Sequence, residues 1–408
     1  MKILWISFLG AWTLPLLNRI KKNNQVGVVI PTPHLRQNNF YEKEQIHRFE
    51  LSLKNNELYN PMSLGTFKKY LSIISSFQPD IIHVHGTEKN VAQIQNYIED
   101  IPIVISIQGL LTGSQNYTFN FIPPQKVSAF STIKNRLGIG GFKLMYKNVL
   151  QGIPYETDIL KKGRYFIGRT YWDKAHIMFY NPKALYFHGE ELLRDEFYQQ
   201  AASWDVNRCK EHSIFMPSGF NPIKGMHHAI KTISLLKQYF PNIQLSIPGI
   251  SPKDFPRLTN KLWGEEYIIY CVHLIKQYQL ENNIRFLPRL DAKGMIKEMQ
   301  QAHVFLSPSS IDNSPNAVGE ATMIGIPVVT TPVGGVTSIL EDEKEVLFAP
   351  AGDPYMMAFQ IKRIFENDEL AISLSKNAHL KALKRHDREN TAAQYLRIYQ
   401  EIVKKHHE

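Results

Sequence analysis

The chain has 408 residues, of which 43% are hydrophobic and 21% charged, and its net charge is +10. This length predicts two folded domains, and the composition excludes a disordered or fibrous chain. The only cysteines, Cys209 and Cys271, lie far apart without a CxxC spacing, which favours a reducing compartment and a cytoplasmic location. Residues 1–8 (MKILWISF) predict a β-strand rather than a signal peptide, and no apolar run reaches the roughly 18 residues of a membrane span.

The first half of the chain alternates strands and helices less regularly than the second half. Its expected strands are Ile3–Phe8, Val26–Ile30, Ile81–Val84, Ile103–Ile107 and Leu185–Phe187. Residues 117–165 break the alternation, and we interpret them as a basic insertion. We assign residues 1–205 to a first domain, residues 206–389 to a second domain and residues 390–408 to a C-terminal helix.

The second half shows a regular alternation of short strands and amphipathic helices. Its expected strands are Ser213–Met216, Gln244–Ile247, Ile284–Leu287, Val304–Ser307, Val328–Thr331 and Val346–Phe348. This pattern predicts a doubly wound parallel sheet, and ligands of such sheets bind at the carboxyl ends of the strands. Asp312 and Ser314 follow the strand at residues 304–307, so we expect them at that edge.

The segment from residue 307 to 335 (SPSSIDNSPNAVGEATMIGIPVVTTPVGG) is the most informative part of the sequence. Ser314 is predicted to cap a helix that has Pro315 at its first position. The amino end of a helix suits an anion such as a diphosphate, and Glu320 can accept hydrogen bonds from sugar hydroxyls. The donor-binding residues predicted here are Ser314, Pro315, Asn316, Ala317, Gly319 and Glu320.

Two further segments of the second half belong to the same predicted edge. Lys224 and Gly225, in a PIKG sequence after the first strand, could bring an ammonium group to a phosphate. An isolated lysine of this kind is usually an ordinary surface residue, and only the 307–335 segment favours the binding role. Gly334 and Gly335 follow a later strand and allow close backbone approach, although a plain turn would explain them as well.

In the first half, polar residues follow three expected strands. Gly10 could let the backbone approach a donor, although no GxGxxG fingerprint follows it. His85 and Glu88 lie at the exit of the strand near residue 84 and are predicted to bind the acceptor, while a packed histidine is the commoner role. Gln108 ends the next strand and is expected to point to the same edge.

Two charged residues of the first half remain open to two interpretations. Arg169 starts a helix in the sequence GRTYWDK, where it could bind the donor's phosphates or pair with Asp173 at i+4. Glu190 follows an expected strand and could face the acceptor, or simply begin a helix. The region between Phe121 and Tyr165 contains eight Lys or Arg and two acidic residues, which fits either a solvated surface or an anionic partner.

The sequence motifs give little support for a metal or another cofactor. There is no HExxH motif and no DxD motif after an expected strand. We therefore expect lysine, arginine and helix amino ends to neutralise a diphosphate.

Together the DNSPN, PIKG, HGTE and GRTYWD segments resemble the family 4 glycosyltransferases of the two-domain GT-B fold, and within them a branch that builds bacterial surface polysaccharides. The resemblance implies that Glu320 holds the donor's ribose and that Lys224 binds phosphate. Asp312 stands where the family usually has Glu, and Gln108 where many members have His near the donor sugar. The arginine that commonly precedes the lysine is missing, and Arg285 or Arg289 could replace it.

The resemblance also implies an activity and its partners. It implies two Rossmann-like domains facing a cleft and a metal-independent, retaining transfer from a nucleotide sugar. The acceptor, a saccharide or lipid-linked saccharide, would lie on the first domain. Residues 130–150, basic and partly apolar, could then rest on an anionic membrane.

Two other functions compete with this interpretation. A sugar-nucleotide epimerase of related fold would bind the same donor and transfer nothing. A basic nucleic-acid-binding protein would explain the net charge, but no helix-turn-helix, RNP-like or zinc motif supports it, and it leaves the segment from residue 307 to 335 unexplained.

Overall fold

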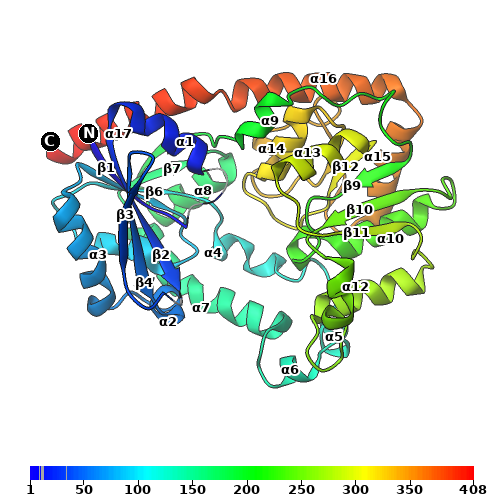
Figure 1. Cartoon of the computed structure of the whole chain (residues 1–408), viewed down its shortest axis with the longest axis horizontal. Helices are drawn as coiled ribbons and strands as arrows, with labels where there is room; N and C mark the ends of the chain where they lie inside the picture. The colour runs from blue at the N-terminus through cyan, green and yellow to red at the C-terminus, as the bar shows by residue number, and fades with distance from the viewer. Residues whose placement is uncertain (9, 11–12, 34) are drawn as a thin grey trace. The chain divides into compact units, whose positions relative to one another are not determined.

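In the computed structural model the chain divides into two compact units (Figure 1). The structure describes residues 1–8, 10, 13–33 and 35–408. Unit 1 consists of Met1–Gln115, Asn148–Leu193 and His386–Glu408, and unit 2 consists of Asn116–Lys147 and Arg194–Arg385. The expected pair of doubly wound α/β domains is thus confirmed, and the C-terminal helix belongs to the first of them.

Unit 1 contains an eight-stranded sheet in the order β3-β4-β2-β1-β5-β6-β7-β8. Its strands are β1 (Lys2–Ile6), β2 (Gln25–Pro33), β3 (Asn39–Lys43), β4 (Ile46–Leu53), β5 (Ile81–His85), β6 (Ile103–Ser106), β7 (Tyr165–Gly168) and β8 (Leu185–His188). All neighbouring strands are parallel except the β3–β4 hairpin. The register places Ile3 of the central strand β1 between Val26 and Ile81.

Helices cover both faces of this sheet because alternate residues of its strands point in opposite directions. Leu4 and Ile6 of β1 belong to one buried cluster and Ile3 and Trp5 to another. The helices of unit 1 are α1 (Thr13–Ile20), α2 (Asn55–Tyr59), α3 (Leu64–Phe77), α4 (Leu111–Ser114), the later part of α7 (Gly141–Lys162), α8 (Tyr171–Tyr180) and α17 (Arg388–His407). Residues of α3, α7 and α8 complete the first cluster, and residues of α1 and α17 complete the second.

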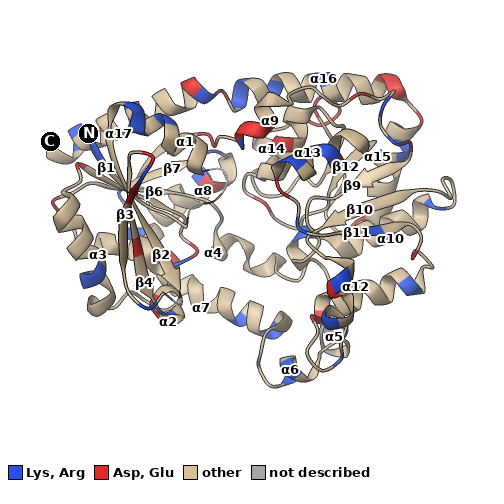
Figure 2. Cartoon of the chain, viewed as in Figure 1, with Lys and Arg blue, Asp and Glu red and all other residues tan. Residues whose placement is uncertain are grey.

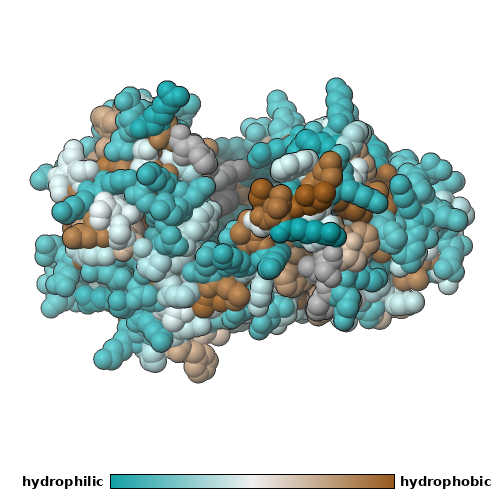
Figure 3. Space-filling view, turned by 90° about the horizontal axis from the view of Figure 1, so that it is seen from below, coloured by the Kyte–Doolittle hydropathy of each residue, from teal (hydrophilic) through white to brown (hydrophobic). Residues whose placement is uncertain are grey.

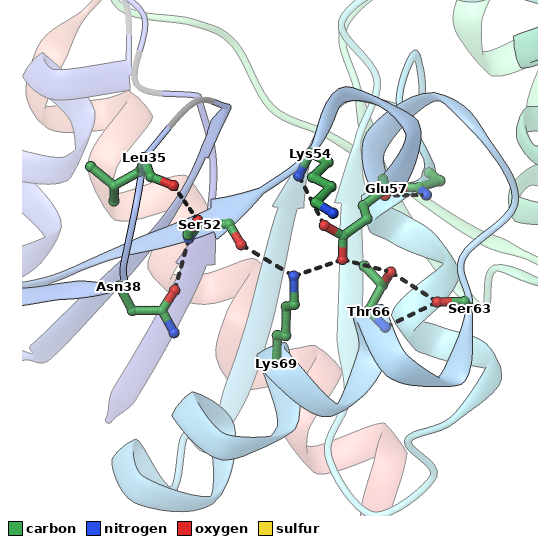
Figure 4. A network of polar contacts seen from close by, with 9 residues as sticks. Leu35, Asn38, Ser52, Lys54, Glu57, Ser63, Thr66 and Lys69 are labelled. Atoms are coloured by element: carbon green, nitrogen blue, oxygen red, sulfur yellow. Dashed lines mark hydrogen bonds and ion pairs between the residues drawn. The ribbon is translucent and has the colours of Figure 1, made fainter.

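A polar network fastens the carboxyl end of β4 to helices α2 and α3 (Figure 4). Glu57 accepts hydrogen bonds from the Lys54 amide (2.9 Å), from Thr66 (3.3 Å) and from the ammonium of Lys69 (2.7 Å). The Ser52 carbonyl accepts a hydrogen bond from the Lys69 ammonium (3.4 Å), and the Ser52 hydroxyl donates one to the Leu35 carbonyl (2.5 Å). These hydrogen bonds connect the end of β4 with α2 and α3, beside the first buried apolar cluster of unit 1.

Unit 2 contains a six-stranded parallel sheet in the order β11-β10-β9-β12-β13-β14. Its strands are β9 (Ser213–Phe215), β10 (Gln244–Pro248), β11 (Ile284–Leu287), β12 (Val304–Ser307), β13 (Val328–Thr330) and β14 (Leu347–Phe348). Its helices are α5 (Pro124–Ala129), α6 (Ile133–Arg136), the start of α7, α9 (Asp195–Gln199), α10 (Met226–Leu236), α11 (Phe255–Leu258), α12 (Glu266–Gln277), α13 (Ala292–Gln301), α14 (Asn316–Ile324), α15 (Pro354–Phe365) and α16 (Asp368–Arg385). Helix α10 packs on α12 and α15, and α14 packs on α9, α13 and α16.

Every strand expected from the sequence is present within three residues of its predicted ends, with the largest difference at β2, which continues to Pro33; three strands were missed. The sequence did not predict the β3–β4 hairpin, because β3 is exposed along its whole length and its residues show no alternating apolar pattern. Strand β7 is only four residues long and fully buried.

The division of the chain differs from the expected domain boundaries at the basic insertion. Residues 117–165 were assigned to the first domain, whereas residues 116–147 pack with unit 2 and only the rest of the segment packs with unit 1. The second boundary lies at Arg194, before the expected residue 206. The packing partners of an irregular segment are not encoded in its own apolar pattern.

Candidate active site

The loops that follow β9 and β12 bring Lys224 and Asp312 together at the carboxyl edge of the unit 2 sheet. Lys224 ends a short 3-10 helix (Pro222–Lys224) after β9, and Asp312 lies in the loop after β12. The Lys224 Nζ is 2.8 Å from Asp312 Oδ1 and 2.9 Å from Oδ2. The lysine side chain is 37% exposed and the aspartate 16% exposed, so solvent and small ligands can reach the pair.

Glycines allow the loops of this edge to approach one another. Gly225 has φ +79°, and a Cβ there would lie 2.1 Å from the carbonyl oxygen of Pro308. Gly334 has φ +53°, and a Cβ there would lie 2.1 Å from the carbonyl oxygen of Asp312. A larger residue at either position would push apart the loops that carry Lys224 and Asp312.

Helix α14 begins one turn after Asp312 and presents its amino end to the same edge. It starts at Asn316, with Pro315 as the residue before it, so the predicted cap at Ser314 is wrong. The Ser314 hydroxyl instead accepts a hydrogen bond from Arg385 (2.9 Å). The first backbone N–H groups of α14, those of Asn316 and Ala317 among them, still point out of the helix start.

Glu320 lies in the second turn of α14 and is 6% exposed. Arg194, directly before α9, donates to both carboxylate oxygens, from Nε to Oε1 and from Nη2 to Oε2, each at 2.7 Å. Burial raises the pKa of Glu320, and the two hydrogen bonds and positive charge of Arg194 oppose that rise. Arg194 therefore favours the ionised carboxylate, the form that accepts hydrogen bonds only. Gly319 precedes Glu320 on the buried side of the helix.

A segment from the first half of the sequence supports the lysine loop. Asn120 is 1% exposed and has the left-handed φ of +47° that asparagine tolerates. Its amide donates to the carbonyls of Pro222 (2.9 Å) and Ile223 (3.1 Å). Its own carbonyl accepts from the rings of His227 (2.9 Å) and His228 (3.0 Å), whose pKa values burial lowers. The geometry of the Lys224 loop thus depends on a residue about a hundred positions earlier.

In unit 1, Arg169, which was predicted to bind the donor, and Gln108, which was predicted as a catalytic residue near the donor sugar, lie in a closed polar cluster. The Arg169 guanidinium forms an ion pair with Glu191, and the two side chains are 2% and 3% exposed. Arg169 also donates to the Ile107 carbonyl (2.6 Å). With its amide oriented to satisfy both atoms, Gln108 donates to Glu191 (2.8 Å) and accepts from Arg169 (3.1 Å). The predicted Arg169–Asp173 pairing is wrong for the side chain, because Asp173 accepts the backbone N–H of Arg169 instead (3.0 Å).

The histidines of β5 belong to the same interior. The His83 ring lies 2.6 Å from the hydroxyls of both Tyr399 and Ser106. The ring centre of His85 is 4.0 Å from that of His83 and 4.3 Å from that of Trp5. Burial, helped by the charge of Arg169, lowers the pKa of His85 to about 3, so its imidazole is neutral. His85, the last residue of β5, is half-buried against these rings, and its role as an acceptor contact stays a prediction.

Glu88 is held by backbone groups at the carboxyl edge of the unit 1 sheet. It accepts from the amides of Gly109 (2.8 Å) and Thr87 (3.0 Å). Glu156 of α7 accepts from Thr87 (2.8 Å) and from the amide of Leu111 (2.9 Å) at the start of α4. Burial raises the pKa of Glu88 to about 7, and the charge of Glu156 acts in the same direction.

The remaining predicted residues of unit 1 lie at its strand exits. Glu190 is 15% exposed, and its Oε1 is 3.1 Å from His188 Nε2. The carbonyl of Gly10 accepts from the amide (3.2 Å) and hydroxyl (2.8 Å) of Thr13 at the start of α1. Both residues stay predictions as ligand contacts.

Neither arginine suggested as a substitute reaches the lysine loop by a recorded contact. Arg285, on edge strand β11, pairs with Glu298 and donates to Ser246 (3.0 Å). Arg289 is an exposed residue after β11. Arg385 and Arg194 are the arginines that bond Ser314 and Glu320. Sequence reasoning missed both, because they lie 71 and 126 residues from their partners.

In residues 1–8, 10, 13–33 and 35–408, no group of three or more His, Cys, Asp or Glu side chains is arranged to hold a metal ion. Over the same residues, no helix is long and apolar enough to cross a membrane.

Two family models match this chain in ranges that contain all the strands of the two sheets except β7 and β8. The model described as glycosyl transferases group 1 matches residues 203–381, and the model described as glycosyl transferase 4-like matches residues 2–128. The chain belongs to the family 4 glycosyltransferases. Lys224, Asp312 and Glu320 all lie in the first of these matched ranges, while residues 129–202 lie in neither.

Several curated glycosyltransferases are similar to parts of the chain. The Escherichia coli protein named for colanic acid biosynthesis, WcaL, is 31% identical over 36% of this chain and 35% of its own length. The phosphatidyl-myo-inositol mannosyltransferase of Mycobacterium leprae is 26% identical over 47% of this chain and 46% of its own length. The chain thus matches between about a third and a half of the length of these relatives.

Solved structures with the same fold cover nearly the whole glycosyltransferase. Sucrose-phosphate synthase from Thermosynechococcus elongatus superposes with a TM-score of 0.71 at 15% identity, covering 98% of this chain and 99% of that one. HepE from Anabaena, in a complex with UDP and glucose, gives a TM-score of 0.65 at 16% identity, covering 98% and 100%. The fold is GT-B, as expected.

Proposed function

We propose that this glycosyltransferase transfers a sugar from a nucleotide-sugar donor to a saccharide or lipid-linked saccharide acceptor, with retention of anomeric configuration and without a metal or other cofactor. The observation that carries the proposal is the joint placement of Lys224, Asp312, the start of α14 and Glu320 at one sheet edge. The complexes of HepE with UDP and with UDP-glucose support a nucleotide-sugar donor. We place the reaction in surface-polysaccharide synthesis, as the name of WcaL suggests.

Lys224 would stabilise the leaving group. Its ammonium lies on the Asp312 carboxylate, and a donor diphosphate would compete for the same positive charge. When the bond between the anomeric carbon and the phosphate oxygen breaks, negative charge grows on the diphosphate. Lys224 and the amino end of α14 are placed to stabilise it. Asp312, released from the lysine, would then face the hydroxyls of the transferred sugar.

Glu320 would recognise the nucleoside. A ribose offers two hydroxyl donors, and an ionised carboxylate offers only acceptors. Arg194 orients that carboxylate with two hydrogen bonds and leaves further lone pairs on each oxygen. In a retaining transfer, the acceptor hydroxyl adds to the anomeric carbon on the face that the phosphate leaves, and its proton passes to the departing phosphate oxygen.

The acceptor would bind to unit 1, near Glu88, Glu190 and the strand exits around them. We propose that the enzyme acts in the cytoplasm, at the surface of an anionic membrane, because the basic segment from residue 130 to 150 suits that partner. Nucleic acid is not proposed as a ligand, because the sequence contains no helix-turn-helix, RNP-like or zinc motif.

A thermal-shift screen of UDP-, GDP-, CMP- and dTDP-sugars tests the donor. One nucleotide series should stabilise the protein, by about 2.7 kcal/mol at a hundred times its Kd. Glu320→Gln should weaken that shift because an amide cannot accept from both ribose hydroxyls through equivalent oxygens. No stabilisation by any nucleotide sugar would contradict the proposal.

Product analysis tests the reaction itself. Incubation with the selected donor and an acceptor should give a glycoside with the donor's anomeric configuration, measured by NMR, and EDTA should not reduce its rate. An epimerised donor formed without acceptor would support the epimerase alternative instead. Tight, salt-sensitive binding to random duplex DNA without donor binding would support the nucleic-acid alternative.

A further inference from the structure

Unit 2 contains an apolar groove that the proposed reaction does not use. It has a volume of about 970 Å³, within the range of pockets that take small organic ligands. One wall is the segment around α6, with Phe130 and Ile133, and the other is formed by α11, α12 and edge strand β11, with Ile269, Val272 and Phe286. The groove is therefore lined by hydrocarbon from both sides.

The wall around α6 is held in place by specific contacts. The amides of Ile133 and Lys134 donate to the carbonyls of Lys261 (3.2 Å) and Leu262 (2.9 Å). The Lys134 ammonium pairs with Glu265 at 2.6 Å, and the ring centre of Phe130 lies 5.2 Å from that of Tyr270. The groove is thus a built feature of the fold.

The charged residues along the groove are mainly positive. Its lining includes Arg136, Lys261 and Lys276 against one acidic residue, Glu281. Over the described part of the chain, no ion pair engages any of these three cations. The segment 116–147 contains five Lys or Arg and no Asp or Glu, and Figure 2 shows basic residues along α6 and the start of α7. An occupant with negative charge complements this rim.

Apolar side chains project into solvent beside the same cations. Ile133, Leu137 and Ile139 are 47%, 67% and 51% exposed, and Leu262 and Trp263 are 48% and 58% exposed. Figure 3 shows hydrophobic residues gathered on a face of unit 2, with hydrophilic residues among them. Exposed aliphatic residues next to lysine, arginine and a tryptophan are typical of surfaces that enter the boundary of a lipid bilayer.

We propose that this groove binds an acyl chain of an anionic phospholipid, and that the face around it, formed by α5, α6 and α12, docks on an anionic bilayer. The chain would lie between Phe130 and Phe286, and the lipid phosphate would meet Arg136, Lys261 and Lys276. The α6 wall lies in the range 129–202 that neither family model matches, whereas the wall formed by α11, α12 and β11 lies in the matched range 203–381. The inference rests on the proposed function in one respect, which is that the enzyme acts at the surface of an anionic membrane.

Vesicle sedimentation with the full-length protein tests the docking face. The protein should sediment with vesicles of phosphatidylcholine and phosphatidylglycerol, and much less with phosphatidylcholine alone. Arg136→Gln and Lys276→Gln should each lower the partition coefficient about fivefold. The double variant Leu137→Ser with Ile139→Ser should lower it at least tenfold by removing exposed apolar surface.

Matched variants in unit 1 separate the groove from general charge or stickiness. Phe179→Ser removes an 89% exposed aromatic side chain of α8, and Lys161→Gln removes an exposed cation of α7 in the same basic stretch of sequence. Both should bind anionic vesicles within twofold of the wild-type protein. Equal losses in these variants and in the groove variants would overturn the proposal.

Tryptophan quenching tests the insertion of acyl chains. Lipids brominated on the acyl chain should quench part of the fluorescence of the five tryptophans. Trp263→Phe should abolish most of that quenching, since Trp263 lies beside the groove. Equal quenching in this variant, or binding of the wild-type protein to neither vesicle, would overturn the lipid assignment. A dimer that the Leu137→Ser, Ile139→Ser variant dissolves would assign the face to a second copy of this chain instead.

Donor binding distinguishes a failure of this inference from a failure of the proposed function. The groove variants should keep the thermal shift produced by the nucleotide sugar, because they lie outside the Lys224 edge. A protein that binds anionic vesicles through this face but no nucleotide sugar would keep the lipid site and refute the donor. A protein that binds the donor but no vesicles would keep the proposed donor and refute the lipid site.

Discussion

The two units each contain a lysine or arginine paired with a carboxylate near the carboxyl ends of a parallel sheet, and the surroundings of the two pairs differ. In unit 1, Arg169 and Glu191 are 2% and 3% exposed, and Gln108 bonds to both. In unit 2, Lys224 and Asp312 are 37% and 16% exposed. A sealed pair has no route to a substrate and acts on stability, whereas an accessible pair can exchange one partner for a phosphate. The same charge pattern therefore serves structure in one unit and, as we propose, catalysis in the other.

The largest expected effect breaks the sealed pair. Glu191→Gln should destabilise unit 1 by about 3–5 kcal/mol, because it leaves the Arg169 guanidinium buried without its counter-charge. Calorimetry should show a lower Tm for the transition of that unit. Lys174→Met, at an exposed position of α8, should change stability by no more than about 0.5 kcal/mol. A loss below about 1 kcal/mol in Glu191→Gln would mean that the cluster is hydrated and could serve a ligand.

The accessible pair should respond in the opposite way. Lys224→Ala should lower kcat/KM by about 10²-fold, because it removes the cation next to the leaving diphosphate, and should leave the Tm nearly unchanged. Lys253→Ala removes an exposed lysine after β10 and serves as the control, with activity close to wild type. An Lys224→Ala enzyme within twofold of wild type would show Lys224 to be an ordinary surface residue.

Asn120 links the two kinds of environment, because this buried side chain holds the loop that carries the accessible Lys224. Asn120→Ala should cost about 1–3 kcal/mol, since the carbonyls of Pro222 and Ile223 lose their donor. It should also weaken donor binding in the thermal-shift assay by displacing the Lys224 loop. Asn120→Asp, which keeps the size but loses the donor, should reproduce both effects. Reduced stability with unchanged donor affinity would limit Asn120 to a structural role.

The smallest expected effect is a pH dependence in unit 1. Burial raises the pKa of Glu88 to about 7, with Glu156 and Lys89 as its charged neighbours. The folded state therefore binds a proton that the unfolded state releases near pH 4.5, so stability falls as pH rises from about 4.5 to about 7. Glu88→Gln should remove this decline, although it adds a constant loss because its amide nitrogen faces the N–H groups of Gly109 or Thr87.

Glu57 provides a control of opposite sign within the same unit. Its pKa is lowered, because hydrogen bonds from Lys54, Lys69 and Thr66 outweigh burial. The stability it contributes is present above about pH 4.5 and is lost as pH falls further, and Glu57→Gln should remove that acid loss. The measurement is the Tm of both variants and the wild-type protein from about pH 3 to about pH 8. Parallel Tm curves for Glu88→Gln and wild type would contradict the raised pKa of Glu88.

Much of the fold was predictable from local pattern. In unit 2 the strands at residues 284–287 and 304–307 match their predicted ends, because buried parallel strands are short apolar runs between polar loops. Positions after the strands at residues 213–215 and 304–307 identified Lys224, Asp312 and Glu320 as neighbours at one edge. The β3–β4 hairpin was not predictable in this way, since its outer strand is exposed and shows no alternation of apolar and polar residues.

The partners of the predicted site residues were not predictable. Serine is a residue type that favours helix N-caps, yet Arg385 donates a hydrogen bond to the Ser314 hydroxyl and α14 starts after Pro315. Arg169 has an acidic residue at i+4, yet its guanidinium pairs with Glu191 from another loop. In both cases a long side chain could meet several partners, and packing selected one that sequence spacing does not reveal.

The amino-acid sequence by itself determined the two parallel sheets, the edge at which Lys224, Asp312 and Glu320 gather, and the family. These features follow from apolar periodicity and from residues that lie next to strand ends, which are short-range properties of the chain. Only the tertiary structure decided that Arg169 is sealed, that Arg194 holds Glu320, that Asn120 supports the lysine loop, and that the basic segment lines an apolar groove in unit 2. Burial and pairing depend on side chains brought together from distant positions, and no local pattern encodes them.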